Sequence, residues 1–207
     1  MQTVVNPVKL RHVMDVPNAD YQSLSDEELM MSYSRGDAIA FDELYLRNKA
    51  PLYRYFLRQT SQVPVAEELT HEVWLRVINA RQRYLPKAKF TTYLFQIAHN
   101  CIVDHYRKFS RAQQVDCDDQ FIESMPANTD NNPERQLDRK QAKSLLMALI
   151  KQLPSEQREV FILKEEASLS IEEIATVVGE NPETIKSRLR YAVNKLKAGL
   201  QGILTGT

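Results

Sequence analysis

The chain has 207 residues, 43% of them hydrophobic, and its 27 Lys and Arg residues balance 27 Asp and Glu residues. A chain of this length and composition can bury one or two cores. Zero net charge argues against nucleic-acid binding by the chain as a whole, but the charges are segregated, so single segments remain candidates. With 5 Gly and few alternating β-branched runs, the sequence predicts an all-α fold.

Cysteine usage and motif content narrow the class of protein. Cys101 and Cys117 show no C-x-x-C spacing, and we find neither a signal peptide nor an apolar run long enough for a membrane span. We therefore expect a cytoplasmic protein without membrane insertion. His99, Cys101 and His105 do not share one helix face, which disfavours a metal site. Without a P-loop or H-E-x-x-H motif, we expect no catalytic residues and no cofactor.

Two helices are expected at the start of the folded part. Ser25 and Glu28 form a capping-box pattern before a short helix that ends at Gly36. Asp37 is the expected N-cap of the next helix, which Pro51 should kink or split. The expected core residues of that helix are Phe41, Leu44, Leu52 and Phe56.

A third helix is expected from Val65 to Arg83. Its inner face carries Ala66, Leu69, Val73, Val77 and Ala80, and its outer face carries Glu67, Glu68, His71 and Glu72 near the N-terminus. Carboxylates there interact favourably with the helix dipole, which is a sufficient structural explanation. A docking face for a basic surface of a partner protein explains the composition equally well.

A loop over residues 84–90 should lead to a fourth helix with Thr91 as its N-cap. Its inner stripe is Leu94, Ile97, Ala98 and Cys101, and its outward residues are Gln96, His99, Asn100, Arg107 and Lys108. Between Arg76 and Arg111, eight basic residues and one acidic residue give a net charge of +7. The sequence therefore predicts a strongly basic surface on this part of the chain.

Aromatic residues are interleaved with these charges: Tyr84, Phe90, Tyr93, Phe95, Tyr106 and Phe109. Basic and aromatic side chains together are typical of single-stranded nucleic-acid sites, where the charges follow the backbone and exposed rings stack on bases. We expect Phe90 and Phe95 to lie in the core instead.

The remaining pattern indicates two domains. Residues 112–132 are rich in Asp, Asn and Gln without a sustained period, which predicts a flexible acidic linker. The linker separates a domain over residues 25–111 from a domain over residues 133–204, and residues 1–24 form an N-terminal extension. Because linker and domains carry opposite charges, one hypothesis is that the linker acids cover a basic face of the free protein.

The second domain should begin with a helix from Glu134 to Gln152. The segment L-P-S-E-Q-R-E-V-F-I-L-K follows, and its expected core residues are Leu153, Val160, Phe161 and Leu163. Ser170 and Glu173 then repeat the capping-box pattern, and Gly179 stops that helix. Asn181 and Pro182 start another helix at once, which predicts a helix-turn-helix.

The last helix has one apolar stripe, formed by Ile185, Leu189, Ala192, Leu196 and Leu200. Its other face presents hydrogen-bond donors: Thr184, Lys186, Ser187, Arg188, Arg190, Tyr191, Asn194, Lys195 and Lys197. Donors of this kind suit phosphates and base edges in a major groove. The alternative is an ordinary helical hairpin with a solvated basic face.

Four motifs in order carry a family resemblance. They are G-D-A-I-A-F-D-E-L-Y, A-E-E-L-T-H-E-V-W-L-R-V, F-T-T-Y-L-F-Q-I-A-H-N-C-I-V-D-H-Y-R-K, and L-P-S-E-Q-R-E-V-F-I-L-K with the helix-turn-helix. Together they resemble the successive regions of sigma-70 family RNA polymerase sigma factors of the extracytoplasmic-function (ECF) type. The resemblance implies a non-catalytic factor that binds core polymerase, directs it to promoters and helps to melt promoter DNA.

The resemblance also implies roles for single residues. Polymerase-docking candidates, facing the β′ clamp helices, are Glu67, Glu68, Glu72 and Arg76. Candidates for the minus-ten element are Lys87, Lys89, Gln96, His99, Asn100 and Arg107. Candidates for the minus-thirty-five element are Lys186, Ser187, Arg188, Arg190 and Tyr191. The β flap and an anti-sigma factor are further expected partners.

The chain departs from the family pattern at two positions. Val65 stands where an acidic residue often opens the docking motif, and Tyr93 stands where the fourth helix often has Trp. An alternative function is a stand-alone transcriptional regulator that binds duplex DNA through its C-terminal domain. In that case the N-terminal domain would be a sensor or dimerisation module, which does not require a basic and aromatic segment.

Overall fold

The computed structural model describes residues 20–112 and 144–204. These residues form helices joined by short loops, and no β-strand occurs within these two ranges, so the all-α prediction is confirmed. The linker beyond its first residue, residues 1–19 of the N-terminal extension and the expected helix start at Glu134 lie outside the described residues. The hypothesis about the linker acids also falls outside them.

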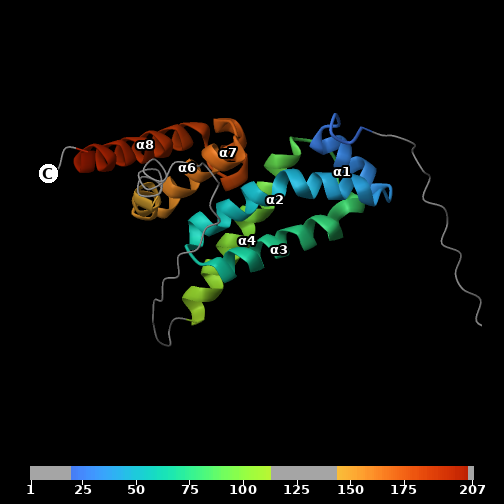
Figure 1. Ribbon diagram of the computed structural model, residues 1–207, viewed down its shortest axis with the longest axis horizontal. Helices are drawn as coiled ribbons and strands as arrows, with labels where there is room; N and C mark the ends of the chain where they lie inside the picture. Colours follow the sequence, from blue (N-terminus) through green and yellow to red (C-terminus); the bar gives the residue numbers. More distant parts are fainter. Residues whose placement is uncertain (1–19, 113–143, 205–207) are drawn as a thin grey trace, which may run out of the picture.

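The first group of helices is α1 (Asp26–Ser34), α2 (Ala38–Thr60), α3 (Val63–Ala80), the 3₁₀ turn η1 (Arg81–Arg83) and α4 (Phe90–Ala112), shown in Figure 1. Both predicted caps are present. The Ser25 hydroxyl accepts a hydrogen bond from the Glu28 amide, and the Asp37 carboxylate accepts from the Ile39 and Ala40 amides. Local sequence thus determines where α1 and α2 begin.

Pro51 lies inside α2 and does not interrupt it, so of the predicted kink or split the split is wrong, and the kink stays a prediction. Proline removes one backbone donor from a helix interior. Here the helix is packed on both sides of the proline, because Leu44, Leu52 and Phe56 are all fully buried. This burial outweighs the lost hydrogen bond and keeps the 23-residue helix continuous.

The second group contains a helix through residues 144–151, then α6 (Ser155–Ala167), α7 (Ile171–Val178) and α8 (Pro182–Leu204). The Ser170 hydroxyl accepts from the Glu173 amide, and Gly179 has the left-handed φ of 72° that ends α7. The Asn181 side chain accepts from the Thr184 amide at 2.8 Å, which starts α8. The predicted helix-turn-helix is therefore formed by α7 and α8.

The buried apolar side chains form one cluster, whose two parts differ in composition. The α1–α4 group is filled by large aromatic side chains, and Tyr55, Phe56, Phe90 and Phe95 are all at most 1% exposed. The C-terminal group is filled by aliphatic side chains, including Ile162, Leu163, Ile174, Ile185 and Leu196. Both parts of the cluster follow from apolar residues at helical spacing.

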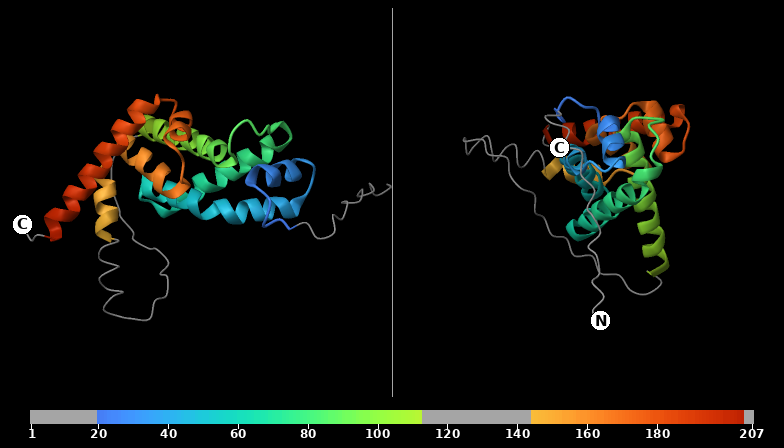
Figure 2. Two further views of the ribbon diagram at one scale, coloured as in Figure 1. Left: turned by 90° about the horizontal axis from the view of Figure 1, so that it is seen from above. Right: turned by 90° about the vertical axis from the view of Figure 1, so that its right-hand side faces the viewer.

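The two groups also pack against each other. Helix α6 lies against α2, and α7 lies against α4, while α8 extends away from the α1–α4 group in two views (Figures 1 and 2). The sequence prediction of two domains on a flexible linker did not anticipate this contact. It brings side chains of α4 and of the helix-turn-helix together.

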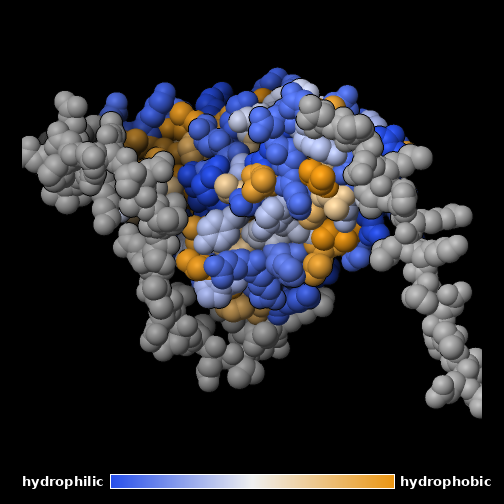
Figure 3. All heavy atoms as spheres, turned by 45° about the vertical axis from the view of Figure 1, so that its right-hand side comes forward, coloured by the Kyte–Doolittle hydropathy of each residue, from blue (hydrophilic) through white to orange (hydrophobic). Residues whose placement is uncertain are grey.

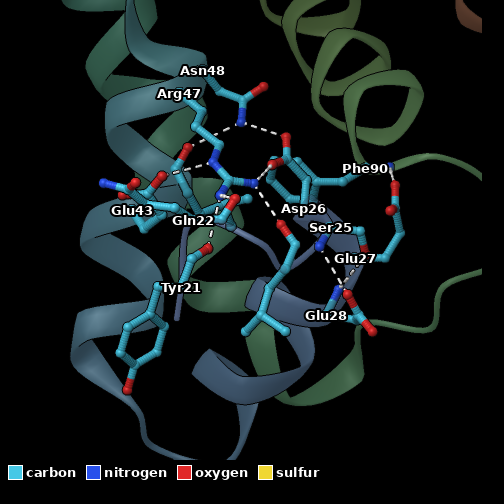
Figure 4. Close-up of polar contacts among 12 residues, drawn as sticks. Tyr21, Gln22, Ser25, Asp26, Glu27, Glu28, Glu43, Arg47, Asn48 and Phe90 are labelled. Carbon is cyan, nitrogen blue, oxygen red and sulfur yellow. Dashed lines mark hydrogen bonds and ion pairs between the residues drawn. The ribbon is translucent and has the colours of Figure 1, made fainter. Parts of the chain in front are cut away.

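Arg47 anchors the first described segment of the chain to α2 (Figure 4). Its guanidinium donates to the carbonyl oxygens of Tyr21 at 2.8 Å, Gln22 at 3.0 Å and Leu24 at 2.7 Å. It also donates to the carboxylates of Glu43 at 2.8 Å and Asp26 at 3.2 Å. The planar, multi-donor shape of arginine makes this set of bonds possible.

Candidate nucleic-acid and polymerase interfaces

The loop between η1 and α4 borders a hollow of about 240 Å³. Its lining residues are Ala80, Arg83, Tyr84, Leu85, Lys87 and Tyr93. Tyr84 is buried and its ring meets Tyr93 edge-on, with 5.3 Å between centroids. The hollow therefore combines basic side chains with aromatic rings, the two chemistries that hold an unpaired base.

The tyrosine hydroxyl of this hollow stays protonated at neutral pH. Burial, with the nearby Glu27 carboxylate as a smaller cause, raises the pKa of Tyr84 to about 12. Within the described residues its hydroxyl has no hydrogen-bond partner. A buried donor without a partner is unfavourable, and this hydroxyl oxygen is itself shielded from the hollow.

Glu27 positions the start of α4. Its carboxylate accepts a hydrogen bond from the backbone amide of Phe90, a residue 63 positions away (Figure 4). The helix begins at Phe90, so the prediction of Thr91 as the N-cap is wrong. The Glu27 carboxylate of α1 thus accepts a hydrogen bond from the Phe90 amide, which an N-cap side chain next to the helix would otherwise accept. Sequence spacing gives no signal for such a distant partner.

The predicted minus-ten residues divide into solvent-facing and paired side chains. Lys87, Gln96 and Asn100 are exposed, as expected from the sequence. Arg107 is exposed and pairs with Asp104 on the same helix at 2.8 Å. The other two, Lys89 and His99, contact acids of the C-terminal group, as described below.

His99 is half-buried, so its predicted outward orientation is wrong. Its Nδ1 lies 2.7 Å from Glu159 Oε1 on α6. The Lys89 ammonium lies 3.0 Å from Glu173 Oε1 on α7. The structure therefore does not bring all six predicted minus-ten side chains together on one free surface.

The aromatic residues near α4 are more buried than the sequence pattern predicts. Tyr84 lies in the core together with Phe90 and Phe95. Tyr106 and Phe109 are exposed on α4, and the Tyr106 hydroxyl donates to the Gln59 carbonyl at 2.8 Å. Phe109 and Tyr106 are thus the clearly exposed rings of the set.

On α8, the side chains predicted to read duplex DNA also differ in their exposure and in their ion pairing. Arg188 is only 19% exposed and lies 2.7 Å from Glu156 and 3.1 Å from Glu180. Lys186 pairs with Glu183 at 2.7 Å. Arg190 is exposed and stands over the exposed Tyr191 ring at 5.4 Å, with Ser187 half-buried on the same helix. The sequence did not signal Glu156, which reaches Arg188 from α6.

The outer face of α3 carries the predicted polymerase-docking residues. Glu67 and Glu68 are exposed, while Glu72 pairs with Arg76 at 2.5 Å. The Arg76 guanidinium also lies 3.8 Å from Asp104 of α4. Leu75, which was not among the predicted docking residues, is 45% exposed on this helix. Leu75 lies off the predicted inner stripe of the helix, and this position could have indicated that its side chain is exposed.

One face of the molecule is mostly hydrophilic and carries separate hydrophobic spots (Figure 3). Among the described residues, no three His, Cys, Asp or Glu side chains are grouped so that they could hold a metal ion. No helix within those residues is long and apolar enough to cross a membrane. The charged and aromatic surfaces above are therefore the candidate sites that we consider.

Family models match both helical groups. The model of sigma-70 region 2 matches residues 44–112, and the model of sigma-70 region 4 matches residues 143–196. Together these matches cover more than half of the chain. They follow the same order as the motifs quoted from the sequence.

Full-length relatives are similar over most of their length. The RNA polymerase sigma-H factor of Pseudomonas aeruginosa is 29% identical over 86% of this chain and 95% of its own. The ECF RNA polymerase sigma factor SigE of Mycolicibacterium smegmatis is 29% identical over 92% of this chain and 75% of its own. The solved complex of the sigma factor RpoE with the anti-sigma factor NepR from Bartonella quintana has a similar fold, with TM-score 0.66, 23% identity, and coverage of 78% of this chain and 96% of RpoE.

Proposed function

Because the chain belongs to the sigma-70 family of RNA polymerase sigma factors, of the ECF type, and so serves promoter-specific transcription initiation, we propose how its surfaces divide that work. Residues 25–111 bind core polymerase and open the minus-ten element. Residues 133–204 read the minus-thirty-five element as duplex. The chain supplies recognition and melting, and polymerase supplies the chemistry.

The hollow beside the η1–α4 loop carries this proposal. Melting requires a site that accepts a base removed from the DNA base stack. Removing the base costs roughly a few kcal/mol. The hollow offers the half-buried Tyr93 ring, which meets the buried Tyr84 ring edge-on, and Lys87 and Arg83 for the phosphates. Gln96 and Asn100 extend this surface along α4.

The polymerase surface is assigned to the outer face of α3. Glu67 and Glu68 supply exposed negative charge, and the Glu72–Arg76 pair and Leu75 supply a polar and an apolar contact beside them. A partner surface with basic residues around an apolar centre would complement this face.

The duplex surface is assigned to α8. Arg190 and Tyr191 are exposed near its N-terminal half, and Lys186 and Ser187 lie one turn earlier. Arg188 must exchange Glu156 and Glu180 for DNA before it can contact a base or phosphate. The location we infer for the protein is the bacterial cytoplasm, where polymerase and promoters are found, and an anti-sigma factor is a proposed partner.

Reconstitution with bacterial core polymerase tests the proposal. We expect the chain to co-elute with core polymerase in a one-to-one complex on size exclusion, and the complex to initiate at specific sites in a pool of genomic fragments. If the chain failed to co-elute and bound duplex DNA tightly by itself, a stand-alone regulator would replace the proposal.

Two pairs of substitutions test the division of surfaces. Glu68→Lys with Glu72→Lys should abolish co-elution with polymerase and leave the isolated fold intact. Arg190→Ala with Lys186→Ala should leave co-elution unchanged and reduce initiation at promoters that depend on the upstream element. Glu165→Lys, an exposed change on α6 outside both surfaces, is the control. The same defect from both pairs would refute the two-surface assignment.

A further inference from the structure

A hollow that the proposed function leaves unused lies between the first described segment of the chain and α2, and its volume is about 540 Å³. The segment lines it with Asp20 and Tyr21, and α2 lines it with Ile39, Asp42 and Leu46, among others. None of its lining residues belongs to the surfaces assigned above to polymerase or to DNA. Both of those partners therefore leave this hollow free.

Two large apolar side chains are exposed at this hollow. Ile39 is 60% exposed and Leu46 is 56% exposed. They lie seven residues apart on α2, which is about two helical turns, so both side chains lie on the same face of the helix. Single exposed apolar residues are ordinary, but a pair that lines one hollow indicates a surface that another segment covers.

The hollow also carries negative charge that is not compensated. Within residues 20–112 and 144–204, the carboxylates of Asp20 and Asp42 take part in no ion pair and no hydrogen bond. The Glu43 carboxylate differs, because it accepts a hydrogen bond from Arg47 at 2.8 Å. An occupant that combines apolar side chains with positive charge would complement this lining.

The wall that the first described segment forms is held in place. Arg47 donates to the backbone carbonyls of Tyr21 and Gln22 (Figure 4). The Tyr21 hydroxyl donates to the Asp37 carboxylate at 3.0 Å, just before α2 begins. Because these bonds fix both the backbone and the ring of Tyr21, the wall is formed before an occupant arrives, which lowers the cost of binding.

We propose that residues 4–14 of this chain bind across the hollow and cover Ile39 and Leu46. Their sequence, V-V-N-P-V-K-L-R-H-V-M, contains six hydrophobic residues, two basic residues and no acidic residue. The hydrophobic side chains match the apolar lining, and the two basic side chains match the two unpaired carboxylates. The inference does not depend on the proposed function, since it involves neither polymerase nor DNA.

The covalent connection to the hollow favours this segment over a separate partner. Five residues, 15–19, join Met14 to Asp20, which itself lines the hollow. Even fully extended, they keep Met14 within about 20 Å of Asp20. A linker this short gives an effective concentration in the millimolar range, so a dissociation constant of about 0.1 mM for the separate peptide would leave the segment about nine-tenths bound. A second copy of the chain has no such advantage.

Photo-crosslinking of the full chain tests the contact. With benzoylphenylalanine in place of Leu10, irradiation should join position 10 to α2 at or next to residues 39–46, as located by mass spectrometry of a digest. In a mixture of isotope-labelled and unlabelled chains, we expect this crosslink to lie within one chain. Crosslinks between labelled and unlabelled chains would assign the hollow to a second copy instead, and the absence of crosslinks to α2 would equally overturn the proposal.

Cleavage of the native protein by trypsin gives a second test, because Lys9 and Arg11 are cleavage sites. A segment that is nine-tenths bound is cut about tenfold more slowly than a free segment. Ile39→Gln with Leu46→Gln removes the apolar lining and should raise the rate of cleavage after Arg11 by up to about tenfold. Val103→Gln replaces a 48% exposed apolar side chain of α4 outside the hollow and should leave that rate unchanged.

A third variant tests the charged part of the contact. Asp20→Asn with Asp42→Asn removes both unpaired carboxylates and should also raise the rate of cleavage after Arg11. Its rate should respond less to added salt than the wild-type rate, because salt screens the ion pairs that the variant lacks. An unchanged helical circular-dichroism signal at the assay temperature shows that each variant is folded. Equal cleavage rates in the wild type and both double variants would overturn the proposal.

Discussion

Helices α1 and α7 are built on the same local plan in different parts of the molecule. Each follows a Ser-x-x-Glu capping box, each has eight or nine residues, and each is followed by a glycine with positive φ. They differ in what surrounds the capping glutamate. Within the described residues, the Glu28 carboxylate bonds only in its own cap, whereas Glu173 also pairs with Lys89. The comparison shows that one local motif can carry an additional contact between domains.

The largest expected effects come from the glycines that end the two helices. Gly36 has a φ of 105° and Gly179 a φ of 72°, and a Cβ at either position would meet nothing within 4 Å. The penalty for alanine is therefore conformational, about 1–2 kcal/mol in the left-handed region. Because Gly36 lies further from the left-handed well, Gly36→Ala should lower the free energy of unfolding more than Gly179→Ala in urea titrations. Gly179→Asn, which tolerates positive φ, is the control, and a reversed order would contradict this reasoning.

The capping serines should have equal effects. Ser25→Ala and Ser170→Ala each remove one acceptor from an N3 amide, with an expected loss of about 1 kcal/mol in the free energy of unfolding. Ser→Asp at either position keeps an acceptor and should recover most of the loss. If Ser170→Ala were much worse than Ser25→Ala, the cap of α7 would depend on its surroundings more than its geometry indicates.

The capping glutamates should differ in their pH dependence. The Ser25 amide lowers the pKa of Glu28, and the Ser170 amide, with a smaller contribution from Lys89, lowers the pKa of Glu173. A carboxylate with a lowered pKa in the folded state stabilises the fold above its unfolded pKa, and that stabilisation is lost as pH falls through the folded pKa. Glu173→Gln should therefore destabilise the protein at pH 7 and cease to do so in acid. Glu28→Gln should follow the same trend with a smaller amplitude, as measured by urea titrations at several pH values.

The smallest effect should be the coupling between Lys89 and Glu173. Lys89 is largely exposed, so a double-mutant cycle of Lys89→Ala and Glu173→Gln should give about 0.2–1 kcal/mol of coupling. The same cycle with Lys87→Ala should give none, because within the described residues the cation paired with Glu173 is Lys89 and not Lys87. Equal coupling in both cycles would mean that Glu173 of α7 interacts with the overall positive charge of the loop and not specifically with Lys89.

The contrast between caps formed within a few residues and contacts between distant residues explains which features the sequence could predict. Ser25, Ser170, Asn181 and Gly179 act on amides or dihedral angles within a few residues, so their roles follow from spacing. The Glu27–Phe90 and Glu159–His99 contacts join residues 63 and 60 positions apart, and nothing in the local pattern identifies such partners. Most fold features were therefore predictable, whereas the pairing state of His99, Lys89 and Arg188 was not.

The Arg47 contacts have a consequence for the order of assembly. The carbonyls of Tyr21, Gln22 and Leu24 bond to a side chain that lies 23 to 26 residues further along the chain. During synthesis, this first segment must leave the ribosome well before its anchor exists, and it can be fixed only after the middle of α2 has formed. In pulse-labelled refolding, the amide proton of Ser23, which donates to the Asp20 carbonyl at 3.0 Å, should therefore become protected after those of α2.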